Sequence, residues 1–385
     1  MEEQKNNYIP FNKPIVTGTE ENLISKVINN GTFGGNNYYT EKCHDFFRNN
    51  YGFKNSFLTH SCSLALEIAA ILCDLSPRDE VIIPSYAYVT DASSFVKTGA
   101  KVVFADSEET SPNISPISIR EKINSKTKVL VIVHYASIAC DMSEILNIVE
   151  EFNLILVEDC AQGIHAKYKN KFLGSFGHIS TFSFHETKNI QCGEGGLLVI
   201  NDLGLLEKSS QIWNEGTNKK DFIDGKVSSY EWTTLGSSYQ PSEITAAFLY
   251  SQLTQIEKIT ERRKNKWQFY YKELIHLEKE NKIILQKKDS NSSFNAHIFY
   301  IKLNSKNERE KLQQYLKYKK ISATFHFLPL HKSNYWLNKE NNDLTLTNAE
   351  NWSDCLIRLP LYDSIKLTQQ TIVIDSLLSF FNQKT

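Results

Sequence analysis

The chain has 385 residues, a formal net charge of −1, 41% hydrophobic residues and 23% charged residues. This balance is typical of a globular protein with a large core, and it gives no general attraction to nucleic acid or to an anionic membrane. Residues 1–7 contain no apolar segment, and no apolar run reaches the roughly 18 residues of a membrane span. The cysteines are odd in number, scattered and without a C-x-x-C pair. This pattern argues against a disulfide framework or a metal site and favours reduced thiols in the cytoplasm.

The N-terminal part contains one predicted helix and one candidate phosphate site. A helix is expected over residues 20–29, and a polar, glycine-rich loop over residues 31–37 suits a plain connector or a substrate-facing loop equally well. The segment 57–63, which ends in Ser61, Cys62 and Ser63, then leads into an apolar helix over residues 64–72. Small hydroxyl residues at this position cap a helix, and the free N–H groups behind them are a ready site for a phosphate.

An alternation of strands and helices begins at residue 80. Strands are predicted over residues 80–84, 101–106, 128–134 and 154–157, and helices over residues 92–97, 117–124 and 142–153. Continuous apolar strands alternating with amphipathic helices indicate a mostly parallel sheet that is covered on both faces. Working residues of such sheets lie at the carboxyl ends of strands. Asp159 follows one such end, and Tyr86 and Tyr88 follow another.

A single lysine, Lys188, lies in the polar turn between two predicted strands, residues 179–184 and 197–200. Gly193, Gly195 and Gly196 follow it. Such an arrangement suits an amine that forms a covalent bond with a carbonyl group, because glycine lets backbone segments come close. A surface hairpin with a solvated lysine is the alternative interpretation.

The C-terminal part changes in pattern. A helix over residues 203–214 and an irregular stretch over residues 215–240 precede a long amphipathic helix over residues 241–277, which is expected to break near residue 257. Strands follow over residues 297–303 and 321–327, and helices over residues 308–317 and 368–381. We therefore predict a large domain over residues 1–250 and, over residues 251–385, a bridging helix with a small α+β domain.

A strand-end carboxylate followed by a lysine is typical of pyridoxal phosphate enzymes. In that interpretation Lys188 forms a Schiff base with the cofactor aldehyde, and Asp159 keeps the pyridine nitrogen protonated so that the ring accepts electrons. Ser61, Cys62, Ser63 and Ser183 are candidate donors to the phosphate, and Tyr88 is a candidate stacking partner of the ring.

The sequence resembles the DegT/StrS-type sugar-nucleotide aminotransferases, which have the fold-type I pyridoxal phosphate architecture, over essentially the whole chain. The motifs that carry the resemblance occupy residues 157–163, 182–189, 193–196, 236–239 and 359–362. Within the family the chain is especially similar to the dTDP-4-amino-4,6-dideoxygalactose transaminases, whose Ser-Phe-His-Glu-Thr-Lys-Asn and Gly-Ser-Ser-Tyr motifs occur here unchanged.

The resemblance implies a role for each matching position. Lys188 would be the Schiff-base lysine and the proton shuttle between the cofactor and C4 of the sugar, and Asp159 would pair with the pyridinium nitrogen. His185 would lie near the substrate, in a role that the sequence leaves open. Further cofactor contacts would come from Gln162 on the 3-hydroxyl, from Cys62, Ser63 and Ser183 on the phosphate, and from Tyr88 on the ring.

Two departures from the family pattern concern the phosphate. Many relatives have Gly-Thr in place of Cys62-Ser63, and Asn-Tyr-Arg in place of Ser238-Tyr239-Gln240. In those relatives the asparagine reaches the phosphate from the partner subunit. The resemblance therefore implies a homodimer with shared active sites, although Ser238 is shorter than asparagine and the loss of the arginine removes a fixed charge.

The implied function is transfer of the amino group of L-glutamate to C4 of dTDP-4-keto-6-deoxy-D-glucose. The product would be a dTDP-4-amino-4,6-dideoxyhexose, with the galactose type favoured, for O-antigen or other lipopolysaccharide synthesis in the cytoplasm. A glucose-configured product, a C3 aminotransferase and a non-catalytic regulator stay open. A nicotinamide-dependent oxidoreductase lacks the expected G-x-G-x-x-G motif, and the presence of Lys188 disfavours the dehydratase branch of the family.

Overall fold

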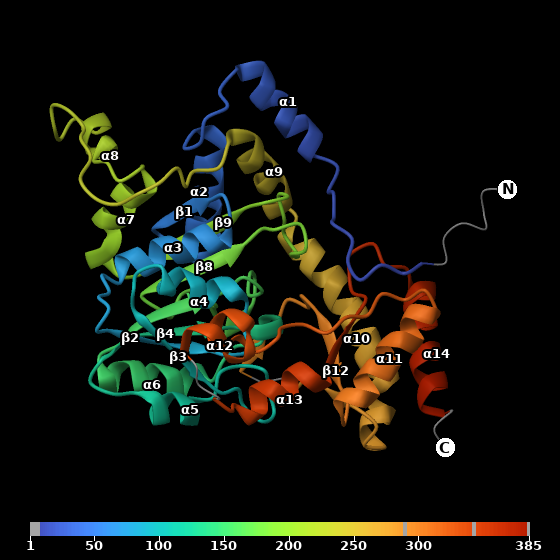
Figure 1. The fold of residues 1–385 in the computed structure, drawn as a ribbon. Helices are drawn as coiled ribbons and strands as arrows, with labels where there is room; N and C mark the ends of the chain where they lie inside the picture. Colours follow the sequence, from blue (N-terminus) through green and yellow to red (C-terminus); the bar gives the residue numbers. More distant parts are fainter. Residues whose placement is uncertain (1–7, 288–290, 341–343, 383–385) are drawn as a thin grey trace.

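The computed structural model describes residues 8–287, 291–340 and 344–382. A seven-stranded sheet forms the core of its larger body, which Figure 1 shows surrounded by helices. The strand order is β1-β9-β8-β5-β4-β2-β3. β9 runs antiparallel to both of its neighbours, β1 and β8, whereas the pairs from β8 to β3 are all parallel. The predicted α/β fold with a mostly parallel sheet is confirmed. The bounds are β1 Ser56–Thr59, β2 Glu80–Pro84, β3 Lys101–Ala105, β4 Thr127–Val133, β5 Ile155–Asp159, β8 Ile179–Ser183 and β9 Gly196–Ile200.

The central strands are mostly apolar because both faces of the sheet are buried. In β4, Val129 and Val131 pack with residues of α3 and α4, whereas Leu130 and Ile132 pack into a second cluster with residues of α2, α6 and α9. Side chains alternate between the two faces of a strand, so a strand buried on both sides shows no polar alternation. The helices of this body are α1 Glu20–Asn30, α2 Tyr38–Tyr51, α3 Cys62–Leu72, α4 Val89–Val96, α5 Pro116–Lys122, α6 Met142–Phe152, α7 Leu206–Trp213, α8 Lys219–Ile223 and α9 Glu243–Leu253.

A second body follows the long helix α10 (Ile256–Lys279), which runs from beside α9 towards α11 and α14 (Figure 1). Its core gathers α10, α11, α14 and a three-stranded antiparallel sheet, and Ile9 from the other end of the chain joins this core. The division at residue 250 stays a prediction. The remaining elements are β10 Ile284–Leu285, β12 Phe299–Lys302, β13 Leu356–Leu359, α11 Lys306–Tyr318, α12 Asn334–Glu340, α13 Thr347–Cys355 and α14 Leu367–Asn382, with a small sheet of β6 Lys167–Tyr168, β7 Lys171–Phe172 and β11 Ser292–Ser293.

The segment around α12 and α13 returns to the large sheet. The carboxylate of Asp106, which follows β3, accepts the backbone N–H groups of Asn348 and Ala349 at 3.1 and 2.7 Å. The Trp336 ring packs edge-on against Phe104 of β3, with ring centroids 4.7 Å apart. A carboxylate is stabilised at a helix N-terminus, so Asp106 fixes the start of α13 against the edge of the sheet.

The long helix expected over residues 241–277, with a break near residue 257, is present as α9 and α10, which are separated at residues 254–255. The strand expected over residues 321–327 is wrong, because this segment makes only single bridges, from Ile321 to Ile9 and from Thr324 to Arg358. The chain then leaves β13, so that His326 and Phe327 reach the cavity described below.

The described residues contain no helix that is both long enough and apolar enough to cross a membrane. All seven cysteines lie in this part of the chain as free thiols. The expectation about the N-terminal residues 1–7 lies outside the described residues.

Candidate active site

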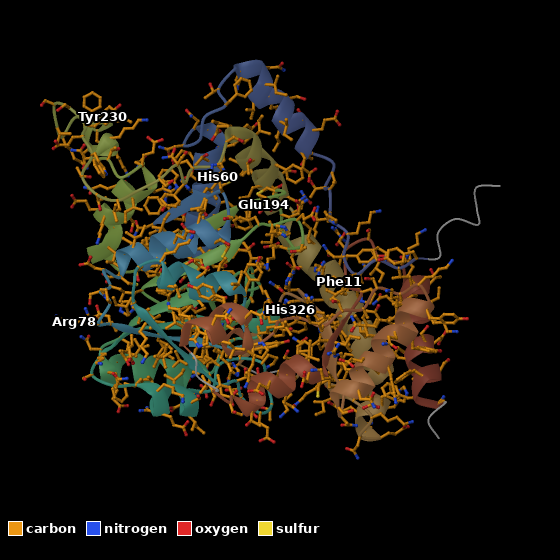
Figure 2. The ribbon with its side chains drawn as sticks, viewed as in Figure 1. Phe11, His60, Arg78, Glu194, Tyr230 and His326 are labelled. Atoms are coloured by element: carbon orange, nitrogen blue, oxygen red, sulfur yellow. The ribbon has the colours of Figure 1, made fainter. Side chains whose placement is uncertain are left out.

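One cavity of about 690 Å³ brings together the predicted site residues except Ser238. It lies between the carboxyl ends of β5 and β8, the first turns of α3 and α4, and the loops of the second body. Phe11, Glu194 and His326, which all line it, lie near the middle of the molecule in Figure 2. The predicted residues in its wall are Ser61, Cys62, Ser63, Tyr88, Asp159, Gln162, Ser183, His185 and Lys188.

The turn between β8 and β9 presents Lys188 to this cavity. The Glu186 N–H donates to the Gly193 carbonyl at 2.8 Å, and the Lys188 N–H donates to the His185 carbonyl, also at 2.8 Å. The His185 ring lies beside this turn, with Nδ1 2.9 Å from the Thr187 hydroxyl and Nε2 3.5 Å from the Glu194 carboxylate. The turn between β8 and β9 forms the hairpin of the alternative interpretation, but Lys188 lines a cavity. His185 therefore braces the turn at the mouth of the cavity.

The surroundings of Lys188 favour its neutral amine form more strongly than bulk water would. Burial lowers the pKa of the Lys188 ammonium, the charge of Asp159 opposes this shift, and the nearby Arg358 guanidinium adds to it. The pKa therefore lies below that of an ordinary lysine. A lysine of lowered pKa is a better nucleophile and a better proton acceptor near neutral pH.

Asp159 and Gln162 are fixed by backbone groups near the end of β5. The Asp159 Oδ1 accepts the Ala161 N–H at 2.6 Å and lies 4.0 Å from the Cys62 thiol. The Gln162 Oε1 accepts the Ala136 N–H at 2.7 Å, which leaves its NH₂ group as the donor for a ligand. Both side chains are buried. A carboxylate and an amide donor thus lie on one wall, the arrangement that a protonated pyridine nitrogen and a ring hydroxyl require.

The start of α3 offers a candidate anion site. The Ser61 hydroxyl accepts the Leu64 N–H at 3.2 Å and so caps the helix. The N–H groups of Cys62 and Ser63 have no partner within the helix and lie at its positive end. A Cβ on Gly196 of β9 would lie 2.5 Å from both the Cys62 nitrogen and the Ser61 oxygen. Glycine at position 196 therefore makes room for the helix start more than for a ligand.

This donor set fits pyridoxal phosphate. The wall offers a carboxylate, an amide, an amine, a helix N-terminus and the Tyr88 ring, which is 56% exposed at the cap of α4. These groups match the nitrogen, hydroxyl, aldehyde, phosphate and ring face of the cofactor. Their individual roles stay a prediction.

Three further residues of the wall come from the second body, and the sequence did not predict them. The neutral state of His297 and His326 follows from burial, which lowers both pKa values well below the ordinary histidine value. His297 Nδ1 lies 3.1 Å from Asn189 Oδ1, and His326 Nδ1 lies 2.7 Å from the Tyr135 hydroxyl.

Arg358 of β13 is the third residue that the second body contributes to the cavity wall. Its Nη2 donates to the Phe325 carbonyl at 2.9 Å and its guanidinium lies over the Phe11 ring at 4.6 Å, whereas its buried Nε has no partner among the described residues. It is the only arginine among the described residues that line the cavity. A charged residue inside the apolar strand Leu356–Leu359 was the sequence signal that could have revealed it.

Two buried side chains join the second body to this wall. The Asn295 amide donates to the Gln162 and Ile164 carbonyls at 2.9 and 2.6 Å. The Arg263 guanidinium on α10 donates to the His297 carbonyl at 2.6 Å and to the Leu361 carbonyl at 3.2 Å. The Asn295 contacts hold the segment before β12 against the loop that carries Gln162, and the Arg263 contacts join α10 to the segments that flank β12 and β13.

Ser238 lies outside the cavity. It is exposed, lies in the segment after α8 and forms a β-bridge with Asn214, which directly follows α7. The same segment carries Tyr230, which Figure 2 shows at the outer edge of the molecule. Within one chain Ser238 makes no contribution to the site.

Among the described residues, one group of side chains has the spacing of metal ligands: His134, Glu158 and Cys160. His134 Nε2 lies 3.0 Å from Glu158, and His134 Nδ1 accepts the Cys140 N–H at 3.1 Å, so both ring nitrogens are occupied. Glu158 also accepts the N–H groups of Gly174, Phe176 and Gly177. This group is a buried hydrogen-bonded cluster that holds the loop before β8.

Comparison with known proteins extends this assignment. The chain is 28% identical over 379 residues to the GDP-perosamine synthase of Escherichia coli O157:H7, with 98% of this chain and 100% of that protein covered. The GDP-perosamine synthase of Vibrio cholerae is also 28% identical, over 378 residues, with 97% and 99% covered.

Solved structures share the fold. A putative sugar aminotransferase, Spr1654 from Streptococcus pneumoniae, superimposes with a TM-score of 0.90 at 22% identity, with 98% of each chain covered. PseC from Helicobacter pylori, an aminotransferase of pseudoaminic acid biosynthesis, gives a TM-score of 0.90 at 22% identity, with 98% of this chain and 100% of that chain covered. The model of the DegT/DnrJ/EryC1/StrS aminotransferase family matches residues 14–378. The chain therefore belongs to this family and is a pyridoxal-phosphate-dependent sugar aminotransferase.

Proposed function

We propose that the chain transfers the amino group of L-glutamate to C4 of dTDP-4-keto-6-deoxy-D-glucose. The product would be a dTDP-4-amino-4,6-dideoxyhexose, with the galactose type favoured, for surface polysaccharide synthesis in the cytoplasm. The observation that carries the proposal is the shared cavity: the Lys188 amine, the Asp159 carboxylate, the α3 N-terminus and Arg358 all line it. The sugar and the nucleotide rest on the Ser-Phe-His-Glu-Thr-Lys-Asn and Gly-Ser-Ser-Tyr motifs. Cytoplasmic action agrees with the seven free thiols.

When bound, pyridoxal phosphate supplies a ring that takes up the electron pair of a breaking C–H bond and carries the amino group between the two substrates. Asp159 would hold a proton on the ring nitrogen, and the Cys62 and Ser63 N–H groups would bind the phosphate. Tyr88 would cover one face of the ring. Lys188, with its lowered pKa, would remove the proton from the amino donor and deliver a proton to C4 of the sugar.

Arg358 suits the amino donor. Glutamate carries two carboxylates, and a guanidinium is the protein group that binds a carboxylate with two parallel hydrogen bonds. Its unpartnered Nε leaves a donor for a ligand. The neutral His297 and His326 suit the hydroxyl groups of a sugar, since a neutral imidazole offers both a donor and an acceptor.

A GDP-linked 4-keto-6-deoxy sugar is the second candidate acceptor. It is favoured by the two curated relatives, whose names give a GDP-linked sugar, perosamine. Both candidates share the pyridoxal phosphate site and the chemistry at C4, so they differ only in the nucleotide and in the sugar configuration.

We also propose that two chains form a homodimer with shared active sites. Ile223, Trp232 and Leu235 are apolar side chains that are 68%, 77% and 68% exposed in one chain, in the segment that also holds Ser238. Such exposure of several large apolar groups is typical of an interface. Light scattering after gel filtration tests this. The expected mass is twice 44.2 kDa, and a monomer at micromolar concentration would contradict the proposal.

The proposed reaction is tested by supplying the holoenzyme with glutamate and, in turn, with the dTDP-linked and the GDP-linked 4-keto-6-deoxy sugar. Formation of 2-oxoglutarate gives kcat/KM for each acceptor, and NMR of the purified amino sugar gives the configuration at C4. We expect a clear preference for the dTDP sugar, and no turnover by Lys188→Ala. The exposed Lys171→Ala variant is the matched control. Preference for the GDP sugar would replace the first candidate with the second.

A further inference from the structure

Asp91 is a buried carboxyl group that lines the active-site cavity and finds no donor. It lies in the first turn of α4, one turn after Tyr88, whose carbonyl accepts the Asp91 N–H at 3.0 Å. The side chain is 0% exposed, and neither carboxyl oxygen has a hydrogen-bond partner among the described residues. An ionised carboxylate in such a place is costly, because burial removes its water and nothing replaces it.

The groups around Asp91 explain why it has no partner. The carboxyl of Asp159 lies within its hydrogen-bonding reach, the Lys188 amine acts on it through its charge, and the Cys62 thiol shares the same surroundings. Two carboxylates are both acceptors, so they bond to each other only when one of them carries a proton. Burial raises the pKa of Asp91 well above its ordinary value, the charge of Asp159 raises it further, and Lys188 opposes the shift. Paired carboxyls in a dry site hold one proton between them.

We propose that Asp91 is a positioning residue: as a neutral carboxylic acid it donates its O–H to Asp159, and it thereby keeps Asp159 ionised and aimed at the cofactor ring nitrogen. The inference rests on the cofactor site of the proposed function. Asp159 already receives the Ala161 N–H, and each further donor makes its carboxylate a weaker base. A weaker base leaves the proton on the ring nitrogen, which is the state in which the ring draws electrons most strongly.

The first test uses the protein without cofactor, so it does not depend on activity. Asp91→Asn keeps a donor of nearly the same shape and removes the titration. A buried acid of raised pKa contributes stability below its unfolded pKa of about 3.9, and this stability is lost as the pH rises towards the folded pKa. As the pH is raised from about 4 to 8, the unfolding midpoint of Asp91→Asn should therefore rise relative to the unfolding midpoint of the wild type. The exposed Asp74→Asn variant is the control and should show no such trend.

The opposite trend would overturn the proposal. If Asp91 were ionised and stabilised by Lys188, Asp91→Asn would lose stability relative to the wild type as the pH rises.

The second test uses the holoenzyme and compares Asp91→Asn with Asp91→Leu, which has a similar size and no donor. We expect Asp91→Asn to keep kcat within about threefold of the wild type and Asp91→Leu to lower it about tenfold or more, because a hydrogen bond to a charged group is lost. The KM values should change little. The absorption band of the bound cofactor should respond to pH as in the wild type for Asp91→Asn, and at a shifted pH for Asp91→Leu. Equal behaviour of the two variants would refute the donor role.

The outcomes separate this inference from the proposed function. If the pH trend in stability is observed but the protein does not transfer the amino group, the carboxyl pair is supported and only the proposed reaction is rejected. Amino transfer without the trend would reject only the role of Asp91. If Asp91→Leu does not fold, Asp91→Asn and its pH trend still decide the question.

Discussion

Replacing Gly196 by alanine tests whether the contact between β9 and the start of α3 holds the phosphate site in place. The new Cβ would lie 2.5 Å from the Cys62 nitrogen and from the Ser61 oxygen, and both are backbone atoms that cannot swing aside. Either the first turn of α3 moves or β9 bends. Extra volume in a packed region typically costs about 1–3 kcal/mol.

The loss should appear in cofactor affinity as well as in stability. A shift of α3 withdraws the Cys62 and Ser63 N–H groups from the phosphate, and a hydrogen bond to a charged group contributes about 1.5–3 kcal/mol. Since about 1.4 kcal/mol is a factor of ten, the Kd of pyridoxal phosphate should rise about tenfold to a hundredfold. Equilibrium dialysis of the apo-protein gives the Kd, and urea unfolding gives the free energy.

Gly34→Ala is the matched control, because a Cβ there meets nothing within 4 Å. If Gly196→Ala binds the cofactor and unfolds as the wild type does, the α3 N-terminus does not hold the phosphate in the way that we describe.

Three further changes have defined outcomes. Ser61→Ala should lower the free energy of unfolding in urea by about 1 kcal/mol, because the Leu64 N–H loses its cap; an unchanged value would contradict the capping role. Arg358→Met should raise the KM for glutamate about tenfold or more while the KM for the sugar changes little, with the exposed Arg78→Met as control; equal changes in both KM values would reject the carboxylate site. The rate of cofactor attachment to the apo-protein should have a pH midpoint below the ordinary lysine value of about 10.4. Asp159→Asn should lower that midpoint further, since the Asp159 charge raises the pKa of Lys188; a rise would contradict the assignment.

The large sheet was predictable because its signal is local. Strands such as β4 and β5 are short, mostly apolar and largely buried on both faces, so their composition identifies them. Helix α2 was missed although Tyr39, Cys43, Phe47 and Tyr51 recur every four residues and all are buried. The helical spacing was present in the sequence, but the many charged and polar residues between these positions made the segment look like an irregular stretch.

The residues of the site also fall into those that the sequence could predict and those that it could not. Lys188 and Asp159 follow strands that the sequence identifies, so their positions at the sheet edge could be predicted. His326 and Arg358 reach the cavity only because the second body packs back onto the sheet, and no local pattern encodes that approach. Asp91 appears in the sequence as an ordinary acidic residue in the first turn of a helix. Its burial beside Asp159 depends on how α4 is packed.

The central claim is that Lys188 is the amine that holds the cofactor and moves the proton. Reduction of the holoenzyme with sodium borohydride fixes the bond between cofactor and lysine, and peptide mass spectrometry then locates the modified residue. The account predicts one pyridoxyl group per chain, on Lys188, and its disappearance when glutamate is added before the reduction. A modification on another lysine, or none at all in a protein that transfers the amino group, would contradict the account.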